Sequence, residues 1–294
     1  MRGAEIVQVQ ENVKLSTKTT FHIGGMVKKL YIPENEEELI KVTSDIYDRD
    51  GKVYIIAGGS NLLVNDKRIF DAVIGMKEVC NTLVDEGQGR FYIGASNRIQ
   101  KVISFVNEKG YGGFEELVGL PAMFGGIIYM NAGIGGEKEP IFTISEFVNK
   151  VRAYDLKDKK IVIFSREECN FSHRKSIFQS GQYIILGAEI KCKEIDAADS
   201  TKRRKSRIEF CRQNFDYGQG CFGSCFSQCN GKLMRVLAIL NRRCTGVSFS
   251  KKTCNWLVNN GNGTFDEAMS LIHKCERIHK LFLQKIEREV IIWK

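Results

Sequence analysis

The sequence predicts an α+β protein built in two parts. Short apolar runs rich in β-branched and aromatic residues are interspersed with segments whose apolar residues recur every three or four positions. The character of the chain changes near residue 195, because seven of the ten cysteines and the densest basic run lie beyond residue 200. A chain of 294 residues is long enough for two domains. We therefore expect one domain over 1–194 and a smaller α/β domain over 195–294.

In the first part, local patterns predict helices and strands in turn. A strand ends at Pro33, and Asn35 then supplies the N-cap of a helix with Glu38 three residues later, as in a capping box. A second helix is expected over 97–110, with Gly110 as its C-cap. Its apolar stripe consists of Ile99, Val102, Ile103 and Val106. Apolar runs predict further strands within 52–64, 70–76, 90–96, 182–192 and, as a hairpin, 147–165.

The second part is expected to be more helical. A basic helix over 200–213 leads into a glycine- and cysteine-rich loop over 220–231, followed by a helix around 232–240 and a strand around 255–260. Thr264 and Glu267 form a capping box at the start of a long amphipathic helix. The core face of that helix is predicted to consist of Ala268, Leu271, Ile272, Cys275, Ile278 and Phe282.

Composition and charge restrict the classes of function. No apolar run approaches the roughly 20 residues of a membrane helix, and the first residues lack the apolar region of a signal peptide. We therefore expect a cytoplasmic protein without a membrane span, whose thiols are reduced. The net charge of +9 favours an anionic partner, either nucleic acid or a phosphorylated small molecule. The run 201–207 has no interleaved aromatic residues, so nucleic acid is the less favoured of the two, and the oligomeric state, a monomer included, stays open.

Three cysteines recur at a spacing of four residues, at Cys221, Cys225 and Cys229. A loop of this kind could ligate an iron–sulfur cluster, but the known cluster loops have other spacings. The chain has no C-x-x-C sequence and only four histidines, which is a poor set of ligands for structural zinc. We therefore expect no metal site.

Two glycine-rich stretches are candidates for contacting a ligand. The first, "AGGSNLLV" (57–64), directly follows an apolar strand, and its glycines allow backbone N–H groups to turn toward an anion. It is not a P-loop, because no Gly-Lys-Ser/Thr follows. The second, "GLPAMFGGIIYMNAGIGG" (119–136), would let backbone approach a flat ligand closely. On composition alone, tight packing explains the second stretch equally well.

Taken with the segment "TTFHIGG" (19–25), these stretches resemble three ordered motifs of the UDP-N-acetylenolpyruvoylglucosamine reductase family. The resemblance covers most of the chain and is closest to the shorter subclass of the family. It implies a two-part FAD-binding domain of the PCMH type over 1–194, and a substrate-binding domain over 195–294 whose last residues return to the active site. The flavin-binding residues that it implies are Ala57, Gly58, Gly59, Ser60, Asn61, Leu62, Gly119, Pro121, Gly125, Gly126, Asn131 and Gly133.

The same resemblance implies three catalytic residues. "CNFSHRKSIF" (169–178) carries Arg174 at the position of the family's arginine, "GSCF" (223–226) carries Ser224 as the proton donor, and "IEREV" (286–290) carries Glu289 as the catalytic glutamate. The implied reaction transfers hydride from NADPH through FAD to UDP-N-acetylenolpyruvoylglucosamine and yields UDP-N-acetylmuramate for peptidoglycan synthesis. The partner is then a sugar nucleotide. Its diphosphate would meet basic residues among Lys202, Arg203, Arg204, Lys205 and Arg207.

The sequence departs from the family pattern mainly where the sugar nucleotide would bind. The family's G-S-x-F-K-N-P stands here as "GSCFSQC", with Ser227, Gln228 and Cys229 at its last three positions. These changes keep a second hypothesis open, a flavin-binding relative that has lost or changed the reductase activity. A nucleic-acid-binding protein without flavin is a third hypothesis. The cysteines around Ser224 also allow a redox-sensing role, because thiolates near basic residues can be reactive.

Overall fold

The computed structural model describes residues 7–135, 140–241 and 245–294. The chain forms two compact units that are both drawn from separate segments. Unit 1 consists of Met1–Glu11, Lys29–Ala57 and Asp71–Ile208, and unit 2 of Asn12–Lys28, Gly58–Phe70 and Glu209–Lys294. The units are therefore not the contiguous segments 1–194 and 195–294. The two units are defined by packing alone. That residues 1–194 bind flavin and residues 195–294 bind substrate therefore stays a prediction.

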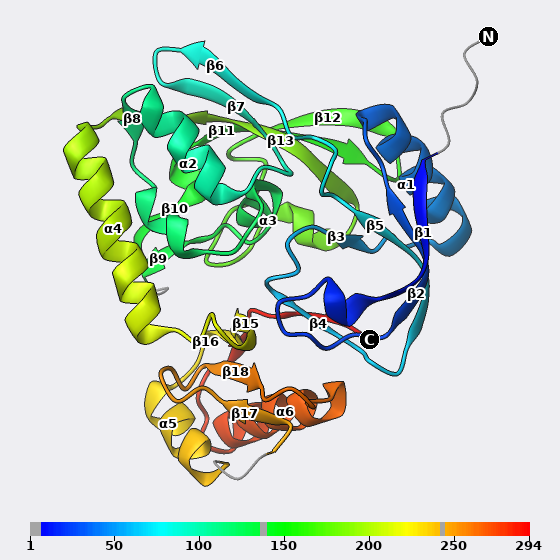
Figure 1. The fold of residues 1–294 in the computed structure, drawn as a ribbon, viewed down its shortest axis with the longest axis vertical. Coiled ribbons are helices and arrows are strands. Elements are labelled where there is room, and N and C mark those ends of the chain that lie inside the picture. The colour runs from blue at the N-terminus through cyan, green and yellow to red at the C-terminus, as the bar shows by residue number, and fades with distance from the viewer. Residues whose placement is uncertain (1–6, 136–139, 242–244) are drawn as a thin grey trace. The chain divides into compact units, whose positions relative to one another are not determined.

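More strands lie wholly within unit 1 than within unit 2 (Figure 1). The elements of unit 1 are α1 (Glu36–Asp50), β3 (Ile55–Ile56), β6 (Leu83–Gly87), β7 (Arg90–Gly94), α2 (Ile99–Glu108), β8 (Tyr111–Gly112), η2 (Glu115–Gly119), α3 (Phe124–Tyr129), β9 (Gly133–Gly135), β10 (Pro140–Thr143), η3 (Ile144–Glu146), β11 (Val148–Asp155), β12 (Lys160–Ser165), η4 (Ile177–Ser180), β13 (Tyr183–Lys191) and β14 (Lys193–Glu194). The unit boundary falls within four further elements, namely β1 (Gln8–Lys14), β2 (Met26–Ile32), β5 (Ile69–Gly75) and α4 (Ala197–Asn214).

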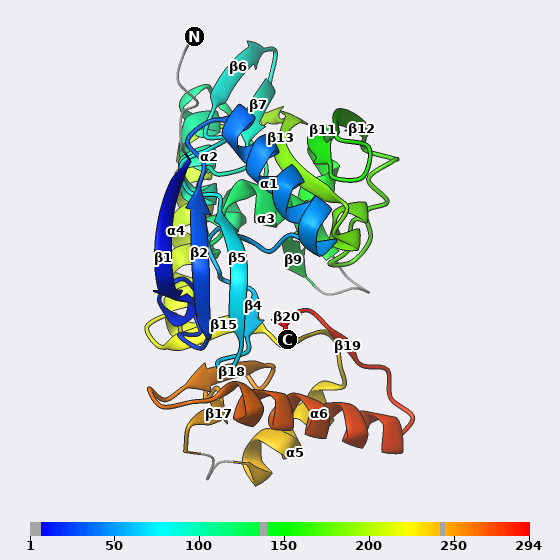
Figure 2. The same cartoon turned by 90° about the vertical axis from the view of Figure 1, so that its right-hand side faces the viewer.

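Unit 1 is organised around a sheet of order β12-β11-β13-β7-β6, and hydrophobic cores lie on both faces of its central strand β13 (Figure 2). Side chains that alternate along β13 enter two different cores, because successive residues of a strand point to opposite faces. Ile185 packs with α2 and α3, whereas Ile184 and Leu186 pack with α1 and β5. A bulge between Ile185 and Gly187 shifts the alternation by one residue, so that Ile190 also faces α2 and α3. The predicted hairpin is confirmed, since β11 pairs antiparallel with β12. Lys150 lies opposite Ser165 at one end of the pairing, and Asp155 lies opposite Lys160 at the other.

The two helices predicted in unit 1 are confirmed, with one adjustment at an end. The Asn35 side chain accepts a hydrogen bond of 2.9 Å from the Glu38 N–H, as the capping pattern predicted. The whole apolar stripe predicted for α2 is buried. The C-cap of α2 is Lys109, and Gly110 follows it with φ +80°, the left-handed conformation for which glycine is favoured.

Unit 2 contains a small sheet and two helices. Its elements are η1 (Leu15–Thr17), β4 (Leu62–Val64), β15 (Gly220–Ser224), β16 (Phe226–Gln228), α5 (Gly231–Leu240), β17 (Val247–Phe249), β18 (Trp256–Asn259), α6 (Phe265–Leu281), β19 (Glu287–Arg288) and β20 (Ile291–Trp293). The sheet has the order β15-β18-β17, while β16 pairs with β19 and β20 pairs parallel with β4. The Thr264 capping box is present at the start of α6.

Two expectations for unit 2 were wrong. The predicted loop over 220–231 is mostly extended, because Phe222 and Phe226 are buried in the unit 2 core from strands β15 and β16. Phe282 does not join that core: it caps the C-terminus of α6 and is 57% exposed. Among the described residues, no helix combines the length and apolar character needed to cross a membrane.

Candidate active site

The predicted site residues are distributed over both units. Arg174 belongs to unit 1, together with the predicted flavin residues Ala57, Gly119, Pro121, Gly125, Gly126, Asn131 and Gly133. Ser224 and Glu289 belong to unit 2, together with Gly58, Gly59, Ser60, Asn61 and Leu62. The predicted site residues thus divide into two groups, one within each unit, and their roles stay predictions.

In unit 1, Arg174 lies at the tip of a tight turn. Ser172 and Lys175 pair across the turn through backbone hydrogen bonds of 3.2 and 3.1 Å. Arg174 itself has φ +57°, a left-handed conformation that costs a non-glycine residue on the order of 1 kcal/mol. Its guanidinium donates to the carbonyl oxygen of Gly133 at 3.0 Å and to that of Asn131 at 3.5 Å. The strained turn therefore holds Arg174 against the second predicted flavin segment.

Further hydrogen bonds join this turn to the segment 129–133. The buried Asn131, with φ +41°, donates from Nδ2 to the Ser172 carbonyl at 2.9 Å and accepts from the Ser145 N–H at 3.2 Å. Ser176 Oγ donates to the Tyr129 carbonyl at 2.7 Å. Asn131 thus bonds through Nδ2 to the Arg174 turn and through Oδ1 to η3, and its predicted contact with flavin stays a prediction. This placement makes it a support for the arginine.

In unit 1, open space and unpartnered polar atoms lie at α3 and at the chain segment packed against it. A Cβ at Gly125 would lie 2.9 Å from the Cβ of Ala95, so this position is closely packed, whereas a Cβ at Gly126 would meet open space. Two neighbours of Ala95 carry buried polar atoms without a hydrogen-bond partner in the structure, Ser96 Oγ and Asn97 Oδ1. Such atoms are costly to bury without a partner. They were missed by the sequence analysis, and a ligand with hydroxyl and N–H groups, as FAD has, would satisfy them.

In unit 2, the first glycine turn is packed tightly against the N-terminal segment. Gly59 has φ +60°, and a Cβ there would lie 2.2 Å from the Lys18 carbonyl oxygen. The Thr20 N–H donates to the Gly59 carbonyl at 3.1 Å. Beyond the turn, Leu63 is fully buried in the core of unit 2 and fixes the outgoing strand β4. The turn can therefore present its backbone to a ligand only because glycine occupies position 59.

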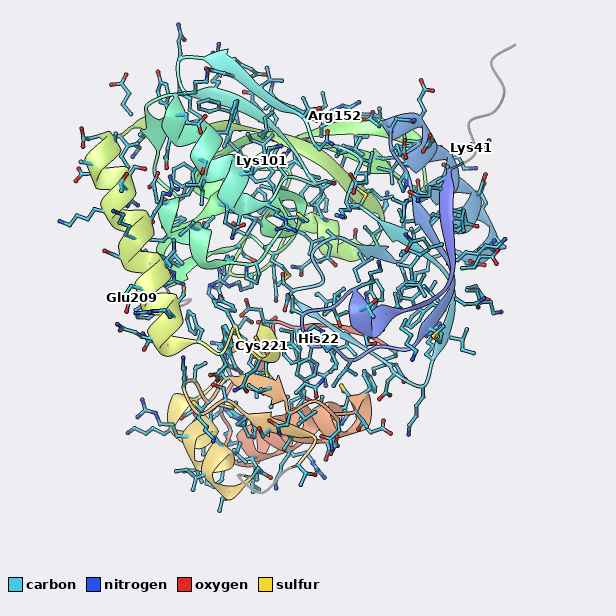
Figure 3. All side chains as sticks on the ribbon, viewed as in Figure 1. His22, Lys41, Lys101, Arg152, Glu209 and Cys221 are labelled. Atoms are coloured by element: carbon cyan, nitrogen blue, oxygen red, sulfur yellow. The ribbon has the colours of Figure 1, made fainter. Side chains whose placement is uncertain are left out.

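Ser224 ends strand β15 at an irregularity in the sheet. The pairing of β15 with β18 changes register between Cys221 and Ser224, and the intervening Gly223 has φ +82°. Cys221, labelled in Figure 3 with His22, pairs by backbone with the segment that contains Thr20. The next residue, Cys225, donates its N–H to the Asn255 carbonyl at 2.8 Å. Ser224 is thus half-buried and lies between two anchored residues.

Glu289 is bonded to the chain beside Ser224 and to the first glycine turn. Its N–H donates to the Cys225 carbonyl at 2.9 Å, next to the pairing of β16 with β19. The Asn61 side chain donates to the Glu289 carbonyl at 3.1 Å, and the Asn61 carbonyl accepts from the Ile291 N–H at 3.1 Å. Unit 2 therefore brings together Ser224, Glu289 and the first predicted flavin turn, although they are far apart in sequence.

Of the cysteines near Ser224, Cys221 and Cys225 are buried and Cys229 is half-buried. Burial raises the pKa of Cys221 and Cys225, and it raises the pKa of Cys229 to about 11. Because the thiolate is the reactive form, these shifts argue against the redox-sensing role considered from the sequence. Within the part of the chain that the structure describes, no group of three or more His, Cys, Asp or Glu side chains is placed to hold a metal ion.

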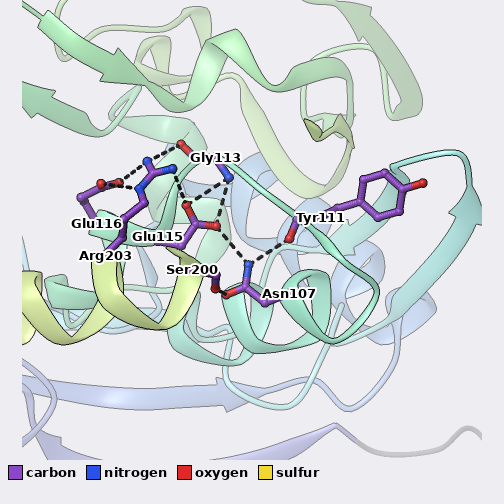
Figure 4. A network of polar contacts seen from close by, with 7 residues as sticks. All are labelled: Asn107, Tyr111, Gly113, Glu115, Glu116, Ser200 and Arg203. Atoms are coloured by element: carbon purple, nitrogen blue, oxygen red, sulfur yellow. Dashed lines mark hydrogen bonds and ion pairs between the residues drawn. The ribbon is translucent and has the colours of Figure 1, made fainter. Parts of the chain in front are cut away.

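One arginine of the basic run on α4, Arg203, forms ion pairs within the protein (Figure 4). Arg203 makes two hydrogen bonds to Glu116, at 2.8 and 2.9 Å, and an ion pair of 3.1 Å to Glu115. Glu115 is only 1% exposed and also accepts from Asn107 Nδ2 and from the Gly113 N–H, each at 3.0 Å. The expectation that Arg203 meets a substrate diphosphate is therefore not supported, because its guanidinium already holds two carboxylates.

We expect Arg203→Ala to lower the free energy of unfolding by about 3 kcal/mol, because it leaves the buried Glu115 carboxylate without its cation. The matched control is Arg212→Ala on the same helix, since the Arg212–Glu209 pair is exposed and worth about 0.5 kcal/mol. Urea unfolding of both variants measures the difference. Equal losses would contradict a special role for the buried pair.

Several known proteins are similar to this chain in sequence, and one of known structure is similar in fold. The family model described as an FAD binding domain matches residues 27–165. The UDP-N-acetylenolpyruvoylglucosamine reductase of Petrotoga mobilis is 30% identical over 99% of this chain and 96% of its own length. The enzyme of the same name from Thermotoga petrophila is 31% identical over 95% of this chain and 97% of its own length. The crystal structure of the reductase from Thermus caldophilus superposes with a TM-score of 0.79 at 24% identity, covering 98% of this chain and 100% of that one.

The fold and the domain match define a flavin-dependent oxidoreductase with an FAD-binding α+β architecture, which confirms the predicted fold class. At 30% identity over nearly the full length, the chain belongs to the UDP-N-acetylenolpyruvoylglucosamine reductase family. The family resemblance predicted from the three motifs is thereby confirmed.

Proposed function

We propose that this protein reduces UDP-N-acetylenolpyruvoylglucosamine to UDP-N-acetylmuramate, with FAD as its resident cofactor and NADPH as the hydride donor. The observation that carries the proposal is the likeness to reductases of that name over 99% of the chain. The backbone bond between Glu289 and Cys225, beside Ser224, supports it from the geometry. A cytoplasmic location and a part in peptidoglycan precursor synthesis follow from this activity and stay predictions.

The proposed cofactor would be held by the two glycine segments. In unit 2, the backbone around Gly59 would face a phosphate group, and in unit 1 the open space at Gly126 and the unpartnered atoms of Ser96 and Asn97 would serve the cofactor. Bound FAD would supply the hydride that is added to the terminal alkene carbon of the substrate. The residues of the chain then have to stabilise the negative charge that this addition creates and to supply the proton that completes it.

Arg174 and Glu289 are proposed to stabilise the charge that develops on the substrate carboxylate. Addition of hydride to the alkene carbon pushes an electron pair toward the adjacent carbon and its carboxylate. Arginine is suited to this task because it stays charged and can bind a carboxylate through two parallel hydrogen bonds. Glu289 would contribute a hydrogen bond, or a proton, to the same carboxylate in its enol form.

Ser224 is proposed to donate the proton that completes the reduction. The carbon next to the carboxylate takes the proton from Ser224 Oγ, so one C–H bond forms as the O–H bond breaks, and water returns a proton to the oxygen. A neutral hydroxyl donates only to a strong base, and a carbanion stabilised as an enol is such a base. The anchors of Cys221 and Cys225 hold the hydroxyl in place for this step.

The proposal is tested with the purified protein, first by its visible spectrum and then by NADPH oxidation with and without the enolpyruvyl sugar nucleotide. We expect a yellow protein whose NADPH oxidation accelerates when the substrate is added. Bound flavin without substrate-dependent turnover would contradict the proposal and favour the hypothesis of a relative with lost or changed activity. A colourless protein that takes up no FAD would overturn both.

A further inference from the structure

Thr20 is a junction between two segments that the proposed mechanism uses. Its N–H donates to the Gly59 carbonyl at 3.1 Å, on the first glycine turn. Its hydroxyl donates to the Cys221 carbonyl at 2.6 Å, and its own carbonyl accepts from the Cys221 N–H at 3.0 Å. A single residue therefore connects the proposed flavin turn to strand β15, and all three segments belong to unit 2.

The connection matters because Ser224 follows Cys221 by three residues across an irregular stretch. Strand β15 loses its regular pairing with β18 between Cys221 and Ser224, where Gly223 has φ +82°. Ser224 pairs again with Trp256 of β18, but the shift in register leaves its position relative to Cys221 undefined by regular strand geometry. On the far side Cys225 is held by Asn255, and on the near side Cys221 is held by its strand pairing with Val258 and by Thr20.

The other end of the junction is equally constrained. Gly59 accommodates the segment before Thr20 so closely that a Cβ would lie 2.2 Å from the Lys18 carbonyl oxygen. Asn259 Nδ2 donates to the Phe21 carbonyl at 2.9 Å and fixes the residue that follows Thr20. Because both neighbours of Thr20 are fixed, a shift of the glycine turn or of Cys221 has to break a hydrogen bond of Thr20.

We propose that Thr20 is a positioning residue that sets the distance between the flavin turn and the proton donor Ser224. The inference rests on the proposed function, since it gives Ser224 and the turn their roles. Loss of the Thr20 hydroxyl frees the Cys221 carbonyl and lets the irregular stretch relax. The Gly59 carbonyl loses only the longer bond of 3.5 Å to that hydroxyl and keeps the bond of 3.1 Å from the Thr20 N–H. Misplacement by about 1 Å can slow a reaction 10²-fold.

The test compares Thr20→Val, which keeps the shape without the hydroxyl, with Thr20→Ser, which keeps the hydroxyl. We expect Thr20→Val to bind FAD and to be reduced by NADPH within about twofold of the wild-type protein. Its flavin reoxidation by the enolpyruvyl substrate should be slower by about tenfold or more. Thr20→Ser should restore that rate to within about threefold. Stopped-flow absorbance of the flavin measures the two half-reactions separately.

Thr19→Val is the matched control. Thr19 is the adjacent residue and is buried, whereas Thr20 is half-buried. The Thr19 hydroxyl bonds within its own segment, to the Ile23 carbonyl at 3.2 Å. It should keep the reoxidation rate even if it unfolds at a lower temperature. Hydrogen exchange gives a readout independent of turnover, because the amide of Cys221 should exchange faster in Thr20→Val and not in Thr19→Val. If Thr20→Val is too unstable for kinetic measurements, the hydrogen exchange of the Cys221 amide is measured instead. Thr20→Ala then serves as the second variant.

The inference is overturned if Thr20→Val reoxidises its flavin at the wild-type rate, or if both half-reactions slow equally. It is also overturned if Thr19→Val slows reoxidation as much as Thr20→Val does. Failure of the proposed function itself has a different signature: the wild-type protein would then show no substrate-dependent reoxidation at all.

Discussion

Ser224→Ala should slow the reoxidation of reduced flavin by the enolpyruvyl substrate by about 10²- to 10⁴-fold, the usual contribution of a positioned general acid. The reduction of flavin by NADPH should stay within about twofold of wild type, because that half-reaction needs no proton from Ser224. The alanine side chain fits the half-buried position at the end of β15, so folding should be little affected. Stopped-flow measurement of each half-reaction separates the two effects.

A conservative replacement and a control make this prediction sharper. Ser224→Cys supplies a more acidic donor at the same position, so it should reoxidise faster than Ser224→Ala. Ser248→Ala removes a half-buried hydroxyl from β17, in the same sheet, and should leave both half-reactions unchanged. If Ser224→Ala slowed both half-reactions equally, the loss would reflect damage to the flavin site, and the assignment of Ser224 as the proton donor would fail.

The elements that sequence reasoning predicted well are those specified by local interactions. Helices α1 and α6 begin where Asn35 and Thr264 supply an N-cap, and such signals depend on residues three positions apart. Helix α3 was not predicted, because its sequence, with Gly125 and Gly126, has low helix propensity. Its glycine at 125 is explained only by the tertiary structure, which brings Ala95 to 2.9 Å from a Cβ there.

In the candidate site, too, some features are predicted by local sequence and others are explained only by the tertiary structure. The motifs that resemble the family indicated which residues to consider, but no local pattern predicts the parallel pairing of β20 with β4, whose strands are separated by more than 200 residues. The same holds for the bonds of Asn61 to the Glu289 segment and of Thr20 to Cys221. Ser96 and Asn97 carried no sequence signal, because a buried polar atom without a partner is recognised only once its surroundings are known.

Arg174 provides the second large expected effect, and the conformation of its turn shows why the residue type matters there. A residue with φ +57° is more often glycine or asparagine, so an arginine at this position pays a conformational cost. Three side chains, those of Asn131, Ser176 and Gln179, hold the turn against the segment 129–133 or to itself. A fold that retains strain under this much support is consistent with a guanidinium that is needed in one orientation.

Arg174→Lys should therefore slow reoxidation by the substrate by about 10²- to 10³-fold, even though the positive charge is kept. Lysine offers a point charge and cannot make two parallel hydrogen bonds to a carboxylate. The control Arg166→Lys changes an exposed arginine of unit 1 and should have no effect. Flavin reduction by NADPH should be unchanged in both variants. If Arg174→Lys reoxidised at the wild-type rate, charge alone would suffice, and the paired hydrogen bonds assigned to Arg174 would be excluded. A loss confined to reoxidation would indicate that the strained turn positions Arg174 for the substrate carboxylate.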